Sequence, residues 1–390
     1  MKLQYDAKKR IFYHSEGTES VISFGKDSFL LNKQDQLSHY SFVIKNCHSI
    51  PLIGILASRK EKNKYKGNFS LFRSIQEDLQ NSGAAAFVFC PDDILDDGIA
   101  GIIYHEQTKK WVKCHFPIPN VIYNRVPARQ DELSQEYKKL LQFIKHHNII
   151  FFNPHFFNKW EVYSVLSANP NLKSLLPKTE LISETARFID FLKANEVIYV
   201  KPVSSSQGKG IKVIELCSDG TITCKSIKKI EKFSSIDRFI QAYSLWFIQN
   251  NRIMQEAIKC ETYNGHRFDY RILVQHNGRE FIVTGIGVRV SGRQDITTHV
   301  PAGGKIVPLK KVASQNIKSQ LTEIANWCGN ELAKAYGYIG EFSIDLAPKR
   351  TGGLILFEVN SKPMSFDEED IEKKRRKELL NTFLVLSKGN

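Results

Sequence analysis

The sequence predicts an open α/β domain followed by a longer α+β region. In the first 127 residues, two apolar runs of buried-strand type, 52–57 and 84–90, enclose a segment with helical spacing, an order typical of α/β folds. Beyond residue 152, short apolar strands occur with helices and hairpin turns, which indicates antiparallel pairing and therefore α+β. The chain has 390 residues and 42% hydrophobic content, which is enough for two or three domains.

The N-terminal domain is expected to span residues 1–127. Short alternating segments near its start predict a strand-rich opening. Asn68 is a suitable cap for a helix, because the apolar residues Leu71, Ile75 and Leu79 follow helical spacing. Further strands of this domain are expected at 99–105, 111–116 and 120–125.

The rest of the chain divides into three parts. They are a helical connector, a region of two α+β subdomains and a charged terminal helix: 128–151, 152–365 (152–253 and 254–365) and 366–390. The connector has Leu140, Leu141 and Ile144 clustered on one side. The terminal segment is acidic and then basic, which predicts a solvated helix, with a contact to a coat partner as the alternative.

Composition narrows the classes of protein. No run approaches the roughly 18–20 apolar residues of a membrane span, and the polar start lacks the apolar centre of a signal peptide. We therefore expect a cytoplasmic protein with no membrane partner. The seven cysteines are scattered without a C-x-x-C pair, which predicts reduced thiols. The net charge of +14 fits a nucleotide with an acidic substrate, or a dispersed positive surface; nucleic acid is not favoured, since no such motif is present.

The last expected strand pair carries three oxygen-bearing side chains. Glu358 and Asn360 are two residues apart on one strand and share a face. In a symmetric hairpin, Asp345 lies diagonally opposite Glu358 on that face. Clustered carboxylates repel each other unless a cation lies between them, and oxygen ligands suit Mg²⁺. The pattern favours a metal site, with a solvated polar face as the alternative.

Lys201 ends an apolar strand and precedes a loop of small residues, 204–210. A lysine there is a half-buried cation that attracts an anion. Gly208 and Gly210 let backbone N–H groups approach a phosphate closely. The loop is not a Walker loop, because G-x-x-x-x-G-K-[ST] is absent. Alone, it is equally typical of a surface loop.

Two further segments could contact a nucleotide or an acid. The strand that ends near Gln255, Glu256 and Ile258 can offer backbone groups to an adenine edge. Arg271 and Arg289 can clamp phosphoryl or carboxylate oxygens bidentately, with a structural or surface role as the alternative.

In chain order, these segments resemble the ATP-grasp ligases over about residues 150–365. The resemblance rests on seven motifs in the family's order: Asn158-Lys159, Leu176–Thr179, Val200–Gly210, Gln255–Ile258, Asp269–Arg271, Gly340–Asp345 and Phe357–Pro363. The D-x-R motif and the later Arg289 are similar to those of RimK-type amino-acid ligases. The resemblance implies two α+β subdomains that clasp ATP, preceded by an open α/β domain.

Within that superfamily, the chain is most similar to the YheC/YheD group of endospore-forming bacteria, on the segments Val121–Arg125 and Glu358–Pro363. That group is described as endospore coat-associated, which implies a sporulation context. Related ligases usually carry an asparagine shortly before a Gly-Gly pair, and His299 stands at that place here. It is a candidate contact for substrate or phosphate, with space filling as the alternative.

The resemblance implies an ADP-releasing carboxylate–amine ligase that forms an amide through an acyl phosphate. The implied nucleotide contacts are Lys159, Lys201, Ser206, Gln207, Gly208, Gly210, Gln255, Glu256, Ile258 and Glu261. Arg271, Arg289 and His299 are the implied catalytic residues, and Asp345, Glu358 and Asn360 would hold one or two Mg²⁺ or Mn²⁺ ions. The implied partners are ATP, an acidic, amino-acid or peptide substrate, and spore-coat proteins. The alternatives are a catalytically silent nucleotide-binding coat protein and a kinase on the same fold.

Overall fold

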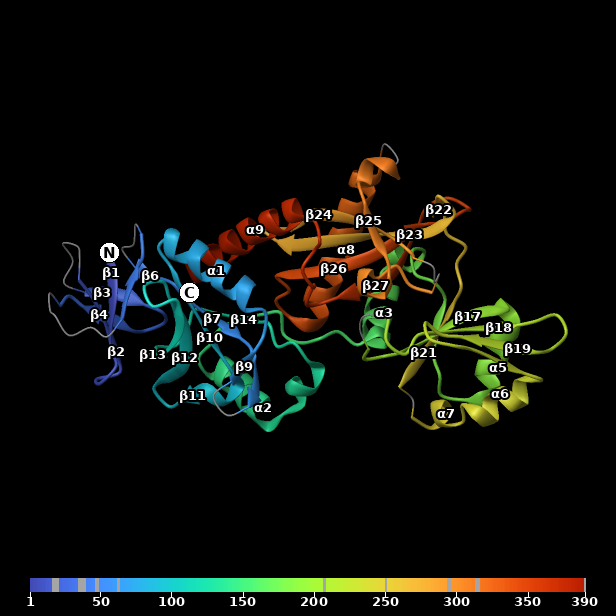
Figure 1. Ribbon diagram of the computed structural model, residues 1–390, viewed down its shortest axis with the longest axis horizontal. Coiled ribbons are helices and arrows are strands. Elements are labelled where there is room, and N and C mark those ends of the chain that lie inside the picture. Colours follow the sequence, from blue (N-terminus) through green and yellow to red (C-terminus); the bar gives the residue numbers. More distant parts are fainter. Residues whose placement is uncertain are drawn as a thin grey trace.

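The computed structural model describes residues 1–15, 21–33, 40–45, 49–61, 64–205, 208–249, 251–292, 296–312 and 316–388. Ser206 and Gln207 of the expected phosphate loop lie outside these ranges. The molecule is elongated, as Figure 1 shows. Small N-terminal sheets occupy one end, the sheet that contains β17 and β18 occupies the other, and the sheet of β23 and β26 lies between them.

The N-terminal end consists of two small sheets, as the alternating sequence predicts. Their strand orders are β2-β1-β5 and β4-β3-β6. The strands are β1 (Lys2–Asp6), β2 (Ile11–His14), β3 (Val21–Phe24), β4 (Phe29–Leu31), β5 (Tyr40–Val43) and β6 (Ser49–Ile50). Their inward aromatic side chains pack into one core with the next sheet; Phe12 lies 5.2 Å from Phe116, centroid to centroid.

The main sheet of the first domain has the order β11-β12-β10-β7-β14-β15, with β13 paired to β12. Its strands are β7 (Leu52–Leu56), β10 (Ala85–Phe89), β11 (Ile94–Leu95), β12 (Gly98–His105), β13 (Lys110–Phe116), β14 (Val121–Asn124) and β15 (Ile150–Phe152). A separate hairpin pairs β8 (Ser58–Glu61) with β9 (Lys64–Lys66). Strands β10, β7, β14 and β15 are parallel, so the predicted open α/β architecture is confirmed.

Helix α1 (Phe69–Asn81) forms where the sequence predicts it. The Asn68 side chain accepts a hydrogen bond from the Leu71 N–H at 3.2 Å, a cap that typically contributes about 1 kcal/mol. Leu71, Ile75 and Leu79 are buried against the sheet.

The expected connector is packed into the first domain. Helix α2 (Gln135–His146) places Tyr137, Leu140 and Ile144 in that core, and β15 extends the sheet beside β14. Leu141, expected on the same side, is 41% exposed instead. The reason is helical geometry: residues 137, 140 and 144 are three and four apart and form one stripe, whereas residue 141 points about 100° away from residue 140.

The far end of the molecule is an antiparallel sheet of order β16-β21-β17-β18-β19-β20. Its strands are β16 (Thr179–Leu181), β17 (Val197–Pro202), β18 (Lys212–Leu216), β19 (Ile222–Lys225), β20 (Ile230–Phe233) and β21 (Arg252–Glu256). Helices α5 (Thr185–Asn195), α6 (Ile236–Ala242) and α7 (Leu245–Gln249) pack on it through Phe188, Phe239 and Trp246. The segment from β20 to α7 was not anticipated from the sequence.

The central sheet has the order β25-β24-β23-β26-β27, with β22 on β23. Its strands are β22 (Thr262–Tyr263), β23 (His266–His276), β24 (Phe281–Val290), β25 (Lys305–Val307), β26 (Glu341–Pro348) and β27 (Leu354–Asn360). Helices α3 (Lys159–Ser167), α4 (Pro170–Lys173) and α8 (Ile317–Tyr336) share a core with it. The short 3₁₀ turns of the chain are η1 (Pro91–Asp93), η2 (Arg129–Leu133), η3 (Val300–Ala302) and η4 (Leu309–Lys311).

The prediction of a solvated terminal helix is wrong. Helix α9 (Glu369–Lys388) lies across both the first domain and the central sheet, as Figure 1 shows. Ile371 packs beside Leu273 of β23, and Leu379 and Phe383 belong to the core of the first domain. The buried side of α9 is a stripe of residues spaced four apart: Ile371, Arg375, Leu379 and Phe383. The many charged residues between them make this stripe hard to recognise in the sequence. None of the helices in the described part of the chain combines the length and apolar character needed to cross a bilayer.

Candidate functional site

The expected strand pair brings its acidic residues together. In the β26–β27 hairpin, Asp345 pairs directly with Glu358, and Ser343 pairs with Asn360. The sequence predicts a diagonal relation between Asp345 and Glu358, and this detail is wrong. The register shifts between Asp345 and Leu346, and such a bulge moves the two carboxylates opposite each other.

Two lysines from different elements face this strand pair. Lys159, the first residue of α3, donates hydrogen bonds to Glu358 Oε1 at 2.8 Å and to the Ser205 carbonyl at 2.6 Å. Burial alone would raise the pKa of Glu358, but Lys159 holds that pKa below its usual range. The Lys201 ammonium, on β17, donates to the Gln255 side-chain oxygen, and burial lowers its pKa to about 8. Lys201 is therefore a half-buried cation whose hydrogen-bond partner is neutral.

The two predicted arginines lie on neighbouring strands of the central sheet. Arg289 is 4% exposed and donates from Nε and Nη2 to Asp269 at 2.9 Å each, while its Nη2 lies 3.1 Å from Asp345 Oδ1. Arg271 Nη1 lies 3.7 Å from the same oxygen. The sequence placed Asp269 in a motif without a role of its own, and the structure shows that it fixes Arg289 bidentately. Thr298 also donates to Asp269.

The carboxylates suit a hard cation. Asp345 Oδ1 is buried and, although ion-paired, accepts no hydrogen bond from any described residue. Burial would raise the pKa of Asp345, and Arg289 and Arg271 hold it low, so the group is charged. A buried, ionised oxygen with unused acceptor capacity, opposite a second carboxylate and near an amide, is the donor set that Mg²⁺ takes in proteins.

His299 stands at the junction of two cavities. Its Nδ1 lies 3.3 Å from Arg289 Nη1, and burial lowers its pKa, so the ring is neutral at neutral pH. A Cβ placed on Gly208 would lie 3.5 Å from the ring, so the described end of the phosphate loop faces it. Gly208 and Gly210 have φ of 70° and 76°, which only glycine adopts without strain.

The smaller cavity lies between the two sheets of the second region and reaches Lys201, Gln255, Ile258, Asp345 and Glu358. The larger one, of about 590 Å³, begins at Glu358 and Asn360 and extends to the first domain. His299 and Arg289 line both. Two adjoining chambers therefore meet at the carboxylates, and a third, small cavity beside them is lined by Lys159, Lys201 and Glu358.

Of the other residues predicted to contact the nucleotide, Glu256 lies in the site and Glu261 does not. Glu256 lines the smaller chamber and accepts a hydrogen bond from the Lys178 N–H at 2.7 Å. Glu261, by contrast, is exposed, does not belong to the lining of either chamber, and its N–H bonds to the Pro348 carbonyl. The structure thus does not bring Glu261 together with the others.

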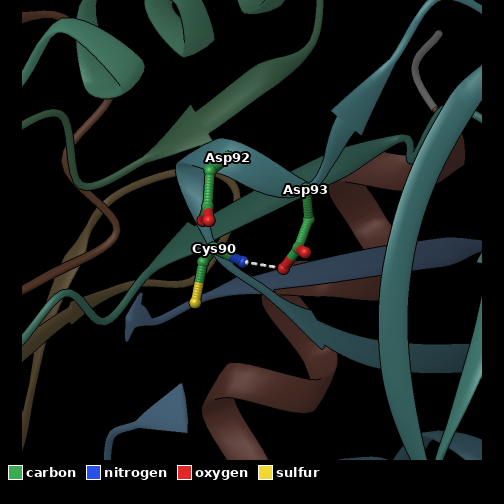
Figure 2. Close-up of side chains that lie close together, drawn as sticks. All are labelled: Cys90, Asp92 and Asp93. Atoms are coloured by element: carbon green, nitrogen blue, oxygen red, sulfur yellow. Dashed lines mark hydrogen bonds between the residues drawn. The ribbon is translucent and has the colours of Figure 1, made fainter. Parts of the chain in front are cut away.

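Another group of possible metal ligands, Cys90, Asp92 and Asp93, lies in the first domain (Figure 2). The Asp93 carboxylate accepts a hydrogen bond from the Cys90 N–H at 2.8 Å, and the Arg59 guanidinium bonds both aspartates. Burial raises the pKa of the Cys90 thiol, which keeps it protonated. Because Arg59 bonds both carboxylates and the Tyr65 hydroxyl also donates to Asp93, this group is a structural turn.

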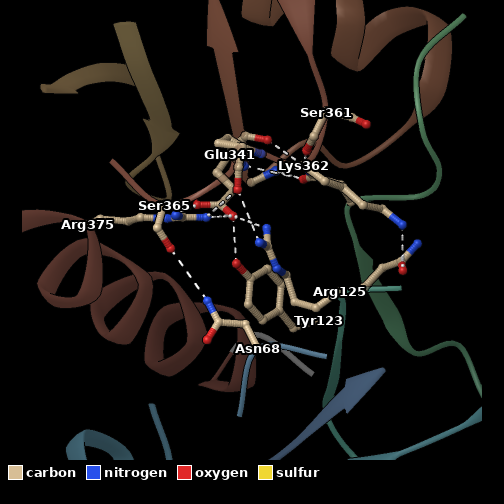
Figure 3. Close-up of polar contacts among 12 residues, drawn as sticks. Asn68, Tyr123, Arg125, Glu341, Ser361, Lys362, Ser365 and Arg375 are labelled. Carbon is tan, nitrogen blue, oxygen red and sulfur yellow. Dashed lines mark hydrogen bonds and ion pairs between the residues drawn. The ribbon is translucent and has the colours of Figure 1, made fainter. Parts of the chain in front are cut away.

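A closed polar network joins the site to the first domain and to α9 (Figure 3). Glu341, at the start of β26, is fully buried and accepts hydrogen bonds from Tyr123 at 2.6 Å, Arg125 at 3.1 Å and Arg375 at 2.7 Å. The Lys362 ammonium bonds Glu132 at 2.5 Å and Asn124 at 2.8 Å.

Asn153 connects the ends of the two site strands. Its side chain accepts a hydrogen bond from the Gly340 N–H at 2.8 Å and donates to the carbonyls of Glu341 and Ser361. No pattern in the sequence predicts this role, because Asn153 follows β15, which belongs to the sheet of the first domain. Its contacts tie the start of β26 to the residue that follows β27.

The architecture is the ATP-grasp fold, with two α+β lobes on either side of a cleft and an open α/β domain before them. Among solved structures, the chain is similar to the VanG D-Ala:D-Ser ligase from Enterococcus faecalis, at 12% identity and a TM-score of 0.52 over 87% of this chain and 100% of that one. It is also similar to D-cycloserine synthetase DcsG, at 12% identity and a TM-score of 0.50 over 85% and 99%. At these identities the likeness shows the fold alone.

Residues 148–386 match the family model described as YheC/D like ATP-grasp, and the chain belongs to this family. It is 29% identical over 336 residues to the endospore coat-associated protein YheD of Bacillus subtilis (strain 168), covering 81% of this chain and 73% of YheD. It is 21% identical over 289 residues to the endospore coat-associated protein YheC of the same organism, covering 70% and 79%.

Proposed function

We propose that this protein is an ATP- and Mg²⁺-dependent carboxylate–amine ligase that acts in the cytoplasm in a sporulation context. The observation that carries the proposal is the convergence of Lys201, Asp345 and Glu358, from two lobes, on one cavity, with Lys159 hydrogen-bonded to Glu358 beside it. Family membership and the two coat-associated relatives support the context.

The nucleotide is assigned to the smaller chamber. Lys201 would bind phosphate there, because an anion compensates the ammonium that burial leaves with a neutral partner. Lys159, which shares an adjacent small cavity with Lys201 and Glu358, would bind a second phosphate group, and the backbone around Glu256 and Ile258 would face the adenine. The loop from 204 to 210 would close over the phosphates and exclude water.

The metal ions are assigned to Asp345, Glu358 and Asn360. When bound, Mg²⁺ neutralises the phosphate oxygens and favours phosphoryl transfer. Lys159 occupies Glu358 Oε1 in the structure, so metal binding would free this lysine for phosphate.

The proposed chemistry has two balanced steps. A substrate carboxylate attacks the γ-phosphorus of ATP, giving an acyl phosphate and ADP; an amine then attacks the acyl carbon, expelling phosphate and losing a proton. Arg271 and Arg289 would neutralise charge on the transferring group, since both guanidinium groups line the larger chamber beside Asp345. The neutral His299 ring would contact the same group.

The test is trapping of the activated acid. The full chain is incubated with Mg²⁺, ATP, hydroxylamine and pools of carboxylic acids, and hydroxamate and ADP are measured. We expect acid-dependent formation of both products, which Glu358→Gln abolishes while the exposed control Glu323→Gln does not.

The other outcomes identify the alternatives. ADP with a phosphorylated product and no hydroxamate would indicate a kinase. Measurable ATP binding without turnover by any pool would indicate a silent nucleotide-binding coat protein. Unchanged turnover in Glu358→Gln would show that the metal assignment is wrong.

A further inference from the structure

The larger chamber carries information about the substrate, and this inference rests on the proposed function. Its volume is about 590 Å³, and it extends from Glu358 and Asn360 to the first domain. It is therefore the space next to the proposed phosphoryl transfer in which an acid would lie.

Most of the cations in its wall are already neutralised by the protein. Arg125 is ion-paired with Glu341 at 3.1 Å, Lys362 with Glu132 at 2.5 Å, and Arg289 with Asp269 at 2.9 Å. Arg125 and Lys362 therefore need no ligand to balance their charge, whereas Arg289 also faces Asp345 and the proposed site of phosphoryl transfer.

Arg129, at the start of η2, is different. Its guanidinium lies 4.9 Å above the Phe156 ring, and it makes no ion pair or hydrogen bond with any residue that the structure describes. Stacking on an aromatic ring orients a guanidinium and leaves its N–H edge free. Burial lowers the pKa of Arg129 without making it neutral, so a cation with free donors lines this end of the chamber.

Arg271, which also lines the chamber, is held in a similar way. Its guanidinium lies 5.4 Å above the Phe366 ring, and its nearest described carboxylate is that of Asp345 at 3.7 Å. Because Asp345 belongs to the metal set, Arg271 marks the end of the chamber where the reacting carboxylate would lie.

The acidic side chains of the wall do not neutralise Arg129. The carboxylate of Glu368 lies against Gly287 of β24, where a Cβ would come within 2.7 Å of it, and it interacts with Arg271 and Arg289. The carboxylates that act on Arg129 are those of Glu132, Glu358 and Glu161. Glu132 is paired with Lys362 and Glu358 with Lys159, and among the described residues none of the three carboxylates forms an ion pair with Arg129, so its N–H edge is open to a ligand.

We infer that Arg129 binds a second anionic group of the substrate acid, so that the substrate class is a dicarboxylate or the acidic end of a peptide. One carboxylate reacts beside Arg271 and Arg289, and the other anchors at Arg129. Arg129 is thus a specificity-determining residue contributed by the first domain. A guanidinium that pairs bidentately with a carboxylate discriminates against the uncharged amide of the same shape.

The experiment measures binding and requires no turnover. The full chain with saturating Mg²⁺ and ADP is titrated calorimetrically with succinate, glutarate and adipate, each compared with its own monoamide. We expect at least one dicarboxylate to bind about tenfold more tightly than its monoamide, the size of one charge-assisted hydrogen bond.

Three variants test whether Arg129 is the source of the preference for a dicarboxylate over its monoamide. Arg129→Gln should reduce it to less than twofold, Arg129→Lys should keep part of it, and the exposed control Arg238→Gln should keep all of it. The ADP dissociation constant should stay within twofold throughout, which verifies the fold.

The inference is overturned if no dicarboxylate exceeds its monoamide, or if the preference survives in Arg129→Gln. If Arg129→Gln does not fold, the inference is tested by comparing the preference for dicarboxylate over monoamide in the wild type and in Arg129→Lys. Failure of the proposed ligase is a separate result: Arg129-dependent dicarboxylate binding without hydroxamate formation from those acids.

Discussion

Strand β26 carries two buried carboxylates four residues apart, and the two differ in their hydrogen-bond partners. Glu341 accepts hydrogen bonds from Tyr123, Arg125 and Arg375, and the network around it joins the first domain, α9 and the central sheet. Asp345 keeps a buried oxygen with no hydrogen bond from the described residues and faces a cavity.

This difference indicates the role of each group of residues, the closed network around Glu341 and the open cluster around Asp345. Where each charge has its partners, the cluster fixes geometry and contributes stability. Where a buried carboxylate is ion-paired but keeps acceptor capacity beside a cavity, as Asp345 does, the protein is arranged for a ligand. The two lysines repeat the contrast, because Lys362 is paired with a carboxylate and Lys201 with an amide.

Breaking the closed network should have the largest effect on stability. We expect Arg375→Met to lower the free energy of unfolding by about 3–5 kcal/mol, because Glu341 would keep its burial and lose its main cation. Urea denaturation measures this. The control Arg376→Met, whose 3.7 Å pair with Asp78 is partly exposed, should cost less than about 1 kcal/mol. A loss below 1 kcal/mol in Arg375→Met would contradict the distinction.

In the open cluster, Lys201→Met should affect binding and spare stability. ADP affinity should fall about 10- to 100-fold, the size of a charge-assisted hydrogen bond, while the urea midpoint stays equal or rises, since a buried ammonium is removed. Calorimetry and denaturation measure the two quantities, with the exposed Lys193→Met as control. Lower stability with unchanged ADP affinity would place Lys201 among the structural residues.

A milder change to the closed network is Tyr123→Phe. It removes one hydrogen bond to Glu341 and leaves both arginines, so we expect a loss of about 2 kcal/mol in unfolding free energy. Thermal and urea unfolding of the variant measure it, and ADP affinity serves as the control. A tenfold change in ADP affinity would show that the two clusters are coupled.

The smallest expected effect is that of pH. The pKa of Lys201 is about 8 in the unliganded protein, and a bound phosphate would raise it, so binding takes up a proton and ADP affinity should fall by up to tenfold per unit above pH 8. Calorimetry from pH 7 to 9.5 measures this, and Lys201→Met should remove the slope.

The free energy of unfolding should change with pH in the opposite direction from ADP affinity. Lys201 and Lys362 both have a folded pKa of about 8, below the ordinary lysine value of 10.5. Between these values the unfolded chain binds more protons, so these groups make the protein more stable as pH rises from 8 to 10.5.

Local pattern predicted much of this molecule. The helix of Asn68, Leu71, Ile75 and Leu79, the hairpin carrying Glu358 and Asn360, and the strand ending on Lys201 all formed where periodicity placed them, because each signal lies within one element. The segment from β20 to α7 was missed, since its short elements are stabilised by a sheet and not by their own spacing.

By itself, the sequence determined the fold class, the family and the set of candidate residues, because these are encoded in residue type and order along the chain. Three features were decided only by the tertiary structure. A bulge sets Asp345 opposite Glu358, and Arg375 of α9 is buried in an ion pair with Glu341. Arg129 lies in the wall of the larger chamber. The physical reason is common to all three. Each depends on contacts between segments far apart in the chain, where burial and charge pairing outweigh local preference.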